Sequence, residues 1–250
     1  MEICHLSDLH LEFGPMEFPQ TDADVVVLSG DIHLGTKGID WAAQFDVPVV
    51  YVLGNHEAYG ASSLELLIEE CRSRAERYSN VYFLENDSVV INGVRFHGCT
   101  LWTDFELYET PKDSMKLARS GLNDYRKIQY HGKPFSPLDA RELHQKSRHF
   151  LYESISQAKE DVNVVVTHHL PSREGIQLEY LGSPLGPAFA SQCDEFSDLA
   201  DKIAVWFYGH NHDCMEFSDF NIKFHTNQRG YVGYEEVSSF DPSKKILISL

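Results

Sequence analysis

The chain has 250 residues, of which 42% are hydrophobic, and its formal net charge is −17. This length and apolar content suit a single folded domain and argue against a disordered chain. The acidic charge disfavours both long nucleic acid and an anionic membrane surface as partners. No apolar run approaches the roughly 18 residues of a membrane span. A small phosphorylated substrate remains compatible with this charge, because bound cations can reverse its sign locally.

The N-terminal residues 1–6 resemble a strand rather than a basic and then apolar leader peptide. The five cysteines are scattered, odd in number and never spaced as Cys-x-x-Cys. This pattern favours free thiols in a reducing cytoplasm over disulfides or a thiolate zinc site. We therefore expect a cytoplasmic protein, and the sequence does not indicate its oligomeric state.

Apolar runs typical of buried strands alternate with helical patterns in the first part of the chain. Strands are expected at residues 3–6, 24–28, 47–53 and 81–84, and helices at 36–45 and 62–78. At the start of the second helix, Ser62 and Glu65 have the spacing of a capping box. Further along, Asn92-Gly93 predicts a tight hairpin between strands at 88–91 and 94–98.

The segment of residues 102–137 mixes charges, aromatic residues and weak helical pattern, and we expect it to be a lid-like insertion. A long amphipathic helix is predicted after it, over 137–159. Later strands are expected at residues 162–166, 203–208, 214–217, 222–225 and 246–249, with a short helix near 193–200. The chain has no internal repeat or linker, so these elements predict one domain over residues 1–250 with a layered α/β fold.

Five of the predicted strands are followed at once by polar side chains of the kinds that bind metals. These are Asp8 and His10, Asp31, Asn55 and His56, His168, and His210 and His212. The carboxyl ends of parallel strands are where ligands bind in α/β sheets, and an i, i+2 spacing lets a loop direct two side chains to one point. Carboxylate, amide and imidazole donors without thiolates suit Mn, Fe, Zn, Ni or Co ions better than Mg or Ca. One such sequence would be an ordinary turn, but five predict a metal site.

In their order along the chain, these motifs resemble those of the calcineurin-like metallophosphoesterase superfamily. The motifs are Asp8-Leu9-His10, Gly30-Asp31, Gly54-Asn55-His56-Glu57, His168 and Gly209-His210-Asn211-His212, which span most of the chain. The resemblance implies a four-layer α/β/β/α sandwich of two mixed β-sheets flanked by helices, with two metal ions at the strand ends. It assigns Asp8, His10, Asp31 and His212 to the first metal, and Asp31, Asn55, His168 and His210 to the second, with Asp31 bridging.

The resemblance further implies a phosphoesterase that hydrolyses phosphomonoesters or phosphodiesters by in-line attack of a metal-bridging hydroxide. Asn55 and His56 would contact the substrate, and His56 would stay off the metals to protonate the leaving group. Glu57 would orient the His56 ring or support its charge. Arg126 and Arg173 lie in lid-like or loop-like segments and are further candidates for substrate contact. A nucleotide, cyclic nucleotide or small phospho-metabolite is the expected substrate.

Other interpretations remain open at this stage. Gly54-Asn55-His56-Glu57 is also similar to the serine/threonine protein phosphatases, although residues 32–35 lack the Asp-Arg-Gly of those enzymes. A nucleic-acid phosphoesterase is a further alternative, as is a non-catalytic metal-binding partner module, which would have lost a ligand or His56. His33 and His169 could also face the site, and residues 227–231 resemble the late loop that closes such sites.

Overall fold

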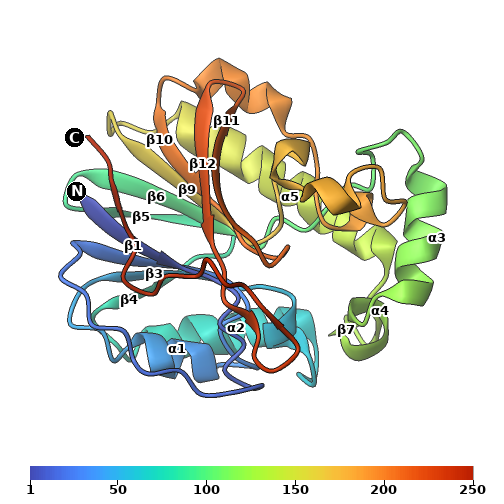
Figure 1. The fold of residues 1–250 in the computed structure, drawn as a ribbon, viewed down its shortest axis with the longest axis horizontal. Coiled ribbons are helices and arrows are strands. Elements are labelled where there is room, and N and C mark those ends of the chain that lie inside the picture. The colour runs from blue at the N-terminus through green and yellow to red at the C-terminus, as the bar shows by residue number, and fades with distance from the viewer. Residues whose placement is uncertain (250) are drawn as a thin grey trace.

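The computed structural model describes residues 1–249, whose strands form two large sheets packed face to face (Figure 1). The first sheet has the order β15-β1-β2-β3-β4. Strands β1 to β4 run parallel to one another, and β15 pairs antiparallel with β1. The bounds are β1 Glu2–Leu6, β2 Val25–Ser29, β3 Val49–Val52, β4 Val81–Phe83 and β15 Lys245–Leu247.

The second sheet has the order β11-β12-β10-β9-β6-β5. Its central strands β6, β9, β10 and β12 are parallel, and β5 and β11 pair antiparallel at the two edges. The bounds are β5 Asp87–Ile91, β6 Val94–Cys99, β9 Asn163–Thr167, β10 Ile203–Phe207, β11 Cys214–Asp219 and β12 Ile222–Asn227. Both sheets are therefore mixed, as the sequence predicts.

Alternation along the strands explains the layering. On β2, Val25 and Val27 join the apolar core between the sheets, whereas Val26 and Leu28 join the core beneath the helices. Helices α1 (Lys37–Ala42) and α2 (Leu64–Ala75) cover the first sheet, and α5 (Pro137–Ser156) covers the second (Figure 1). The predicted four-layer α/β/β/α sandwich is confirmed.

The turn and cap signals of the sequence have mixed outcomes. Asn92 and Gly93 both have positive φ, 49° and 83°, and they join β5 to β6 in the tight hairpin expected. The capping box expected at α2 is wrong, because Ser63 rather than Ser62 precedes the helix and makes no side-chain cap bond. Glu65 accepts a hydrogen bond from the backbone of His131 instead.

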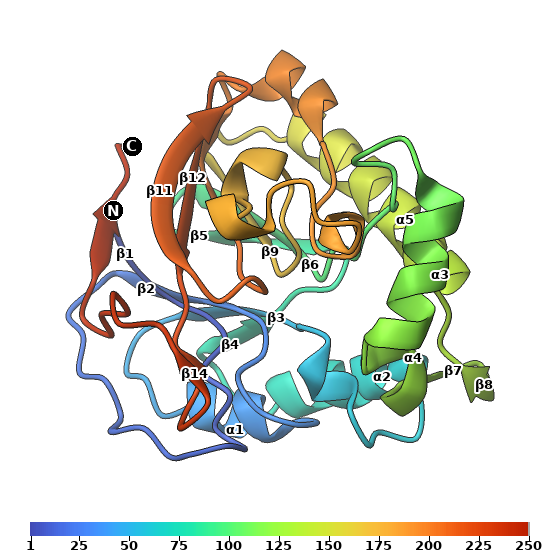
Figure 2. The same ribbon diagram turned by 45° about the vertical axis from the view of Figure 1, so that its right-hand side comes forward.

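Residues 102–137 contain more regular structure than their sequence suggests. They form α3 (Pro111–Gly121), α4 (Asp124–Lys127) and a small hairpin of β7 (Gln129–Tyr130) and β8 (Lys133–Pro134). Figure 2 shows α3 and α4 standing at one side of the sandwich. Four 3-10 turns, η1 His56–Ala58, η2 Arg173–Gly175, η3 Leu178–Tyr180 and η4 Gly186–Ala188, a longer 3-10 segment, η5 Asp194–Leu199, and the hairpin β13 (Gly230–Tyr231) and β14 (Glu235–Glu236) complete the described elements. Among the helices of residues 1–249, none combines the length and apolarity needed to cross a membrane.

Candidate metal centre and active site

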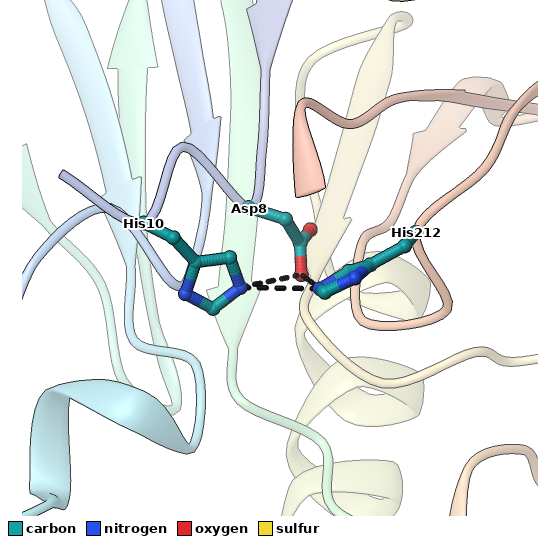
Figure 3. Close-up of side chains that lie close together, drawn as sticks. All are labelled: Asp8, His10 and His212. Atoms are coloured by element: carbon teal, nitrogen blue, oxygen red, sulfur yellow. Dashed lines mark hydrogen bonds and ion pairs between the residues drawn. The ribbon is translucent and has the colours of Figure 1, made fainter. Parts of the chain in front are cut away.

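The carboxyl ends of β1, β2, β3, β9 and β10 bring the predicted metal ligands to one edge of the sandwich. Asp8, His10 and His212 form one cluster there, drawn in Figure 3. The Oδ1 atom of Asp8 lies 3.6 Å from Nε2 of His212 and 3.9 Å from Nε2 of His10. Residues separated by 202 positions in sequence thus present their ligand atoms to one point.

A second cluster, which contains His168, lies next to the first, and Asp31 lies between the two. The two carboxylate oxygens of Asp31 face different clusters: Oδ2 is 3.5 Å from Nε2 of His10, and Oδ1 is 3.6 Å from Nε2 of His168. Asp8, Asp31 and His168 also form a group whose ligand atoms could hold an ion. Asp31 therefore occupies the position that a bridging carboxylate would need.

The hydrogen bonds around the first cluster leave two electron lone pairs facing each other. Nδ1 of His10 lies 3.1 Å from a carboxylate oxygen of Glu12, and Nδ1 of His212 lies 3.5 Å from Glu235. A carboxylate only accepts, so each Nδ1 carries the proton and each Nε2 carries a lone pair. The two Nε2 atoms are 3.1 Å apart. Two acceptors at this distance fit a cation coordinated by both, and they cannot hydrogen-bond each other.

The second cluster contains the same kind of pair. Nδ1 of His168 donates to the carbonyl of Ser29 at 2.8 Å, which leaves its Nε2 unprotonated. The side-chain amide of Asn55 donates to Asp124 at 2.8 Å, so its oxygen faces Nε2 of His168 at 3.1 Å. Nε2 of His210 is buried without a hydrogen-bond partner. These donors fit a second cation.

Burial controls the charge states of the cluster. It is the largest effect on Asp8, whose pKa rises to about 8, and neighbouring carboxylates add to the rise. Burial likewise raises the pKa of Asp31 well above its usual value. It lowers the pKa of His10 to about 3 and holds the pKa values of His168 and His210 well below the usual range. Neutral imidazoles are ready to coordinate, and a bound cation would keep both carboxylates ionised at neutral pH.

Most of the predicted ligands occupy the left-handed backbone region, which non-glycine residues rarely adopt. The φ values are 50° for Asp8, 43° for His10, 55° for Asp31, 81° for His210 and 49° for His212. Adjacent glycines allow close approach: a Cβ on Gly54 would lie 2.0 Å from Oδ1 of Asp31, and one on Gly209 would lie 2.2 Å from the hydroxyl of Ser7. Such conformations concentrate at functional sites.

His56 lies at the mouth of the clusters with both ring nitrogens engaged. Its Nδ1 is 3.3 Å from Glu12, and its Nε2 is 3.0 Å from the hydroxyl of Tyr231. The ring packs against Tyr59 with centroids 4.3 Å apart. One ring nitrogen of His56 could also reach an ion shared with His10 and Asp31.

Glu57 has a different role from the one expected. It is fully buried and accepts hydrogen bonds from the backbone N–H groups of Asp31, Ile32 and Gly54 and from the hydroxyl of Tyr51. The expectation that it orients the His56 ring is wrong, because these bonds lead to Tyr51 on β3 and to the loops that carry Asp31 and Asn55. Glu12 is the carboxylate beside the His56 ring.

Several weaker candidates lie away from the clusters. Arg126 is exposed and donates to a backbone carbonyl at the end of α3, and Arg173 is exposed beside a glutamate. Neither lines the cavity described below. The His33 ring accepts a backbone hydrogen bond and does not line the cavity either. His169 is buried behind the site, with its ring 4.1 Å from that of His210.

Four residues near the clusters were not predicted from the sequence: Glu12, Tyr59, Asp124 and Tyr231. The strict alternation of Asp8, His10 and Glu12 was a usable signal for the first. For the segment 227–231, which contains Tyr231, the sequence indicates only a late loop that closes the site. Nothing in the local sequence around Tyr59 or Asp124 marks these residues, because α4 brings Asp124 to Asn55 across 69 positions.

A cavity of about 460 Å³ opens onto the clusters. One side is formed by residues of the strand ends, including Asp31, His56 and His210. The opposite side comes from residues 121–124 and from the segment 170–189. Its volume falls within the range typical of small-molecule sites.

Comparisons with known proteins agree with this arrangement. A family model described as calcineurin-like phosphoesterase matches residues 1–214. An uncharacterized protein, L509, of Acanthamoeba polyphaga mimivirus is 24% identical over 270 residues, covering 95% of this chain and 93% of that protein. The crystal structure of a phosphopantetheinyl hydrolase from Mycobacterium tuberculosis has a TM-score of 0.72 at 17% identity, covering 98% of this chain and 95% of the other.

A putative 5'-nucleotidase from Staphylococcus aureus has a TM-score of 0.51 at 14% identity, with 91% of this chain matching 48% of that protein. These two structures show a shared fold. The family model covers most of the chain and includes all the strand ends that carry the clusters. The chain therefore belongs to the calcineurin-like phosphoesterase family and is a metal-dependent phosphoric ester hydrolase.

Proposed function

We propose that the protein hydrolyses the phosphate mono- or diester of a small substrate, such as a nucleotide, a cyclic nucleotide or a phospho-metabolite, using two transition-metal ions. The observation that carries this proposal is the pair of facing acceptors in each cluster, at 3.1 Å in both. The cavity volume of about 460 Å³ supports a small substrate rather than a folded protein. Mn, Fe, Zn, Ni and Co all suit the donor set.

We assign the first ion to Asp8, His10, Asp31 and His212, and the second to Asp31, Asn55, His168 and His210. When bound, two such ions activate a water and stabilise the charge on the phosphoryl oxygens. The protein's own contribution is to hold each ligand in one orientation. Glu12, Ser29, Asp124 and Glu235 do so by fixing which atom of each ring or amide faces inward.

His56 is the proposed proton donor to the leaving group. Burial raises the pKa of Glu12, but hydrogen bonds from His10 and His56 outweigh it and lower that pKa to about 2. Glu12 accepts at Nδ1 of His56 and so leaves Nε2 to act toward the leaving group. His56 and Tyr231 both line the cavity, and the hydroxyl of Tyr231 lies 3.0 Å from Nε2 of His56, so both groups would lie near the leaving-group oxygen.

The test combines metal analysis with a hydrolysis screen. The purified protein is reconstituted separately with Mn²⁺, Fe²⁺, Co²⁺, Ni²⁺ and Zn²⁺ and offered chromogenic phosphate mono- and diesters. We expect two ions per chain and hydrolysis with at least one metal. Failure to cleave either class with every metal would contradict the proposal, and one ion per chain would contradict the two-metal assignment.

A further inference from the structure

The described cavity wall has no positively charged side chain that could bind an anionic group of the substrate other than the phosphate at the metal clusters. Among the described residues that line it, none is Lys or Arg. Its charged groups outside the metal clusters are the carboxylates of Asp124 and Glu235. Lys127, which stacks over the ring of Tyr59, does not line the cavity. Apart from the proposed metal ions and His56, the described lining therefore contains no positively charged side chain that would attract an anion.

Apolar side chains form part of the side opposite the strand ends, where Asn123, Gln177, Tyr180 and Ser183 also line the cavity. Leu122 follows α3, and Ile176, Leu185 and Phe189 come from the segment 170–189. The ring of Phe189 lies 4.9 Å from that of His210, centroid to centroid, so the apolar surface begins directly beside a proposed metal ligand. A group attached to the phosphate and directed toward Phe189 would lie against this surface.

Contacts of the segment 170–189 with Tyr108 and Gly121 hold this surface in place. The backbone N–H of Gly182 donates to the hydroxyl of Tyr108 at 3.0 Å, and a Cβ added to Gly121 would lie 3.9 Å from the Leu185 side chain. Ile176 is only 9% exposed. The apolar surface is thus part of the folded structure and does not need a substrate to assemble it.

We infer that the site selects phosphate esters with a single phosphoryl group and an uncharged, apolar organic group, and that it discriminates against substrates with a second anionic group. This inference rests on the proposed phosphoesterase function. An apolar group gains by leaving water for the surface formed by Leu122, Ile176, Leu185 and Phe189. A second phosphate would lose its hydration there, would find no Lys or Arg, and would be repelled by Asp124 and Glu235.

The test uses esters that differ only at the organic group. Phosphates with ethyl, butyl and hexyl chains are compared with a hexyl chain that bears a second phosphate at its far end. Each is offered both as the monoester and as the 4-nitrophenyl diester, so that the leaving group is matched within a series. We expect kcat/KM to rise about twofold to fourfold per methylene, and the terminal phosphate to lower it by about tenfold or more.

A variant of the wall tests the charge argument separately. Leu185→Lys places an ammonium on the cavity wall. We expect it to narrow the difference in kcat/KM between hexyl phosphate and the hexyl bisphosphate by about tenfold. Leu138 on α5 is 67% exposed and does not line the cavity, so Leu138→Lys is the matched control with wild-type selectivity. Equal effects of the two lysines would show that overall charge governs selection and would overturn the inference.

The outcomes separate this inference from the proposed function. A kcat/KM that does not depend on chain length, or that is higher for the bisphosphate, would overturn the inference. It would not contradict the phosphoesterase function. Failure to hydrolyse any ester in either series would overturn both.

Discussion

At the scale of single residues, the site depends on which atom of each side chain faces inward. The Nε2 atoms of His10 and His168 are available because Glu12 and Ser29 take the other ring nitrogen. The oxygen of Asn55 is available because its amide nitrogen donates to a carboxylate. Residues that never touch the substrate therefore decide whether the ligands can bind metal.

The proton-donor role of His56 can be separated from metal binding. His56→Ala is expected to keep both metals and to lose about 10²-fold in kcat, the usual scale for a proton-transfer group. Metal content by elemental analysis and turnover of a chromogenic ester measure the two effects. The exposed His131→Ala serves as the control and should resemble wild type. Loss of metal from His56→Ala would instead place this residue among the ligands.

Asp124 should act on metal affinity through Asn55. Asp124→Ala removes the acceptor that holds the amide orientation, and we expect metal affinity to fall about 10- to 100-fold. Asp124→Asn keeps a carbonyl acceptor and should restore most of that affinity. Asp113→Ala, an exposed change on α3, controls for the loss of a carboxylate from the same segment. Unchanged metal titrations of Asp124→Ala would refute the positioning role.

At the scale of elements, the starts of α5 and α2 show that one helix is stabilised by a local cap and the other by packing against a sheet. Ser136 caps α5 by accepting from the N–H of Asp139, whose carboxylate accepts in return from the backbone of Ser136. Ser63 precedes α2 without any such bond. Helix α2 relies instead on burying Leu67 and Cys71 against the first sheet.

These two serines form a matched pair for a stability measurement. Ser136→Ala should lower the free energy of unfolding by about 1 kcal/mol, the typical cost of losing a helix cap. Ser63→Ala removes a hydroxyl that makes no cap bond and should cost less than about half of that. Denaturant titrations of both variants with the metal content held constant provide the comparison. Equal losses would show that the cap does not stabilise α5.

At the scale of the whole molecule, a histidine pair links the two sheets. Nδ1 of His5 on β1 lies 3.0 Å from Nδ1 of His225 on β12, and both rings are buried. Burial, the largest effect on each, keeps the pKa of His5 well below its usual value and lowers that of His225 to about 4. Both rings are therefore neutral in the folded protein at neutral pH.

This pair predicts acid destabilisation with a defined direction. Between pH 6.5 and 4 the unfolded chain binds a proton at His225 that the folded chain does not, so stability falls as the pH falls. The loss approaches about 3 kcal/mol at pH 4 for that one residue. His225→Gln should flatten the fall in unfolding free energy over this window, whereas the exposed His131→Gln should not. Parallel pH curves for wild type and His225→Gln would rule out this contribution.

The sequence was sufficient for the layered architecture and for locating the strand ends. Apolar runs determine the strands, and parallel strands present their carboxyl ends at one edge, so Asp8 and His168 meet although they lie far apart in the chain. The role of Glu57 could not be predicted, because its hydrogen bonds go to the Tyr51 hydroxyl and to backbone N–H groups of two loops rather than to its neighbour His56. Asp124 could not be found, because its meeting with Asn55 depends on how the 102–137 segment packs.

The left-handed backbone at Asp8, His10, Asp31, His210 and His212 has an evolutionary consequence. Glycine would adopt the backbone conformation of each position at lower energy, because a residue with a Cβ is strained at positive φ. The fold alone does not require this strain. Glycine at such a position would relieve this cost and would remove the metal ligand at the same time. A relative of this protein that retains all five ligands despite the backbone strain is therefore expected to be an active hydrolase, and a relative with glycine at these positions is expected to be inactive.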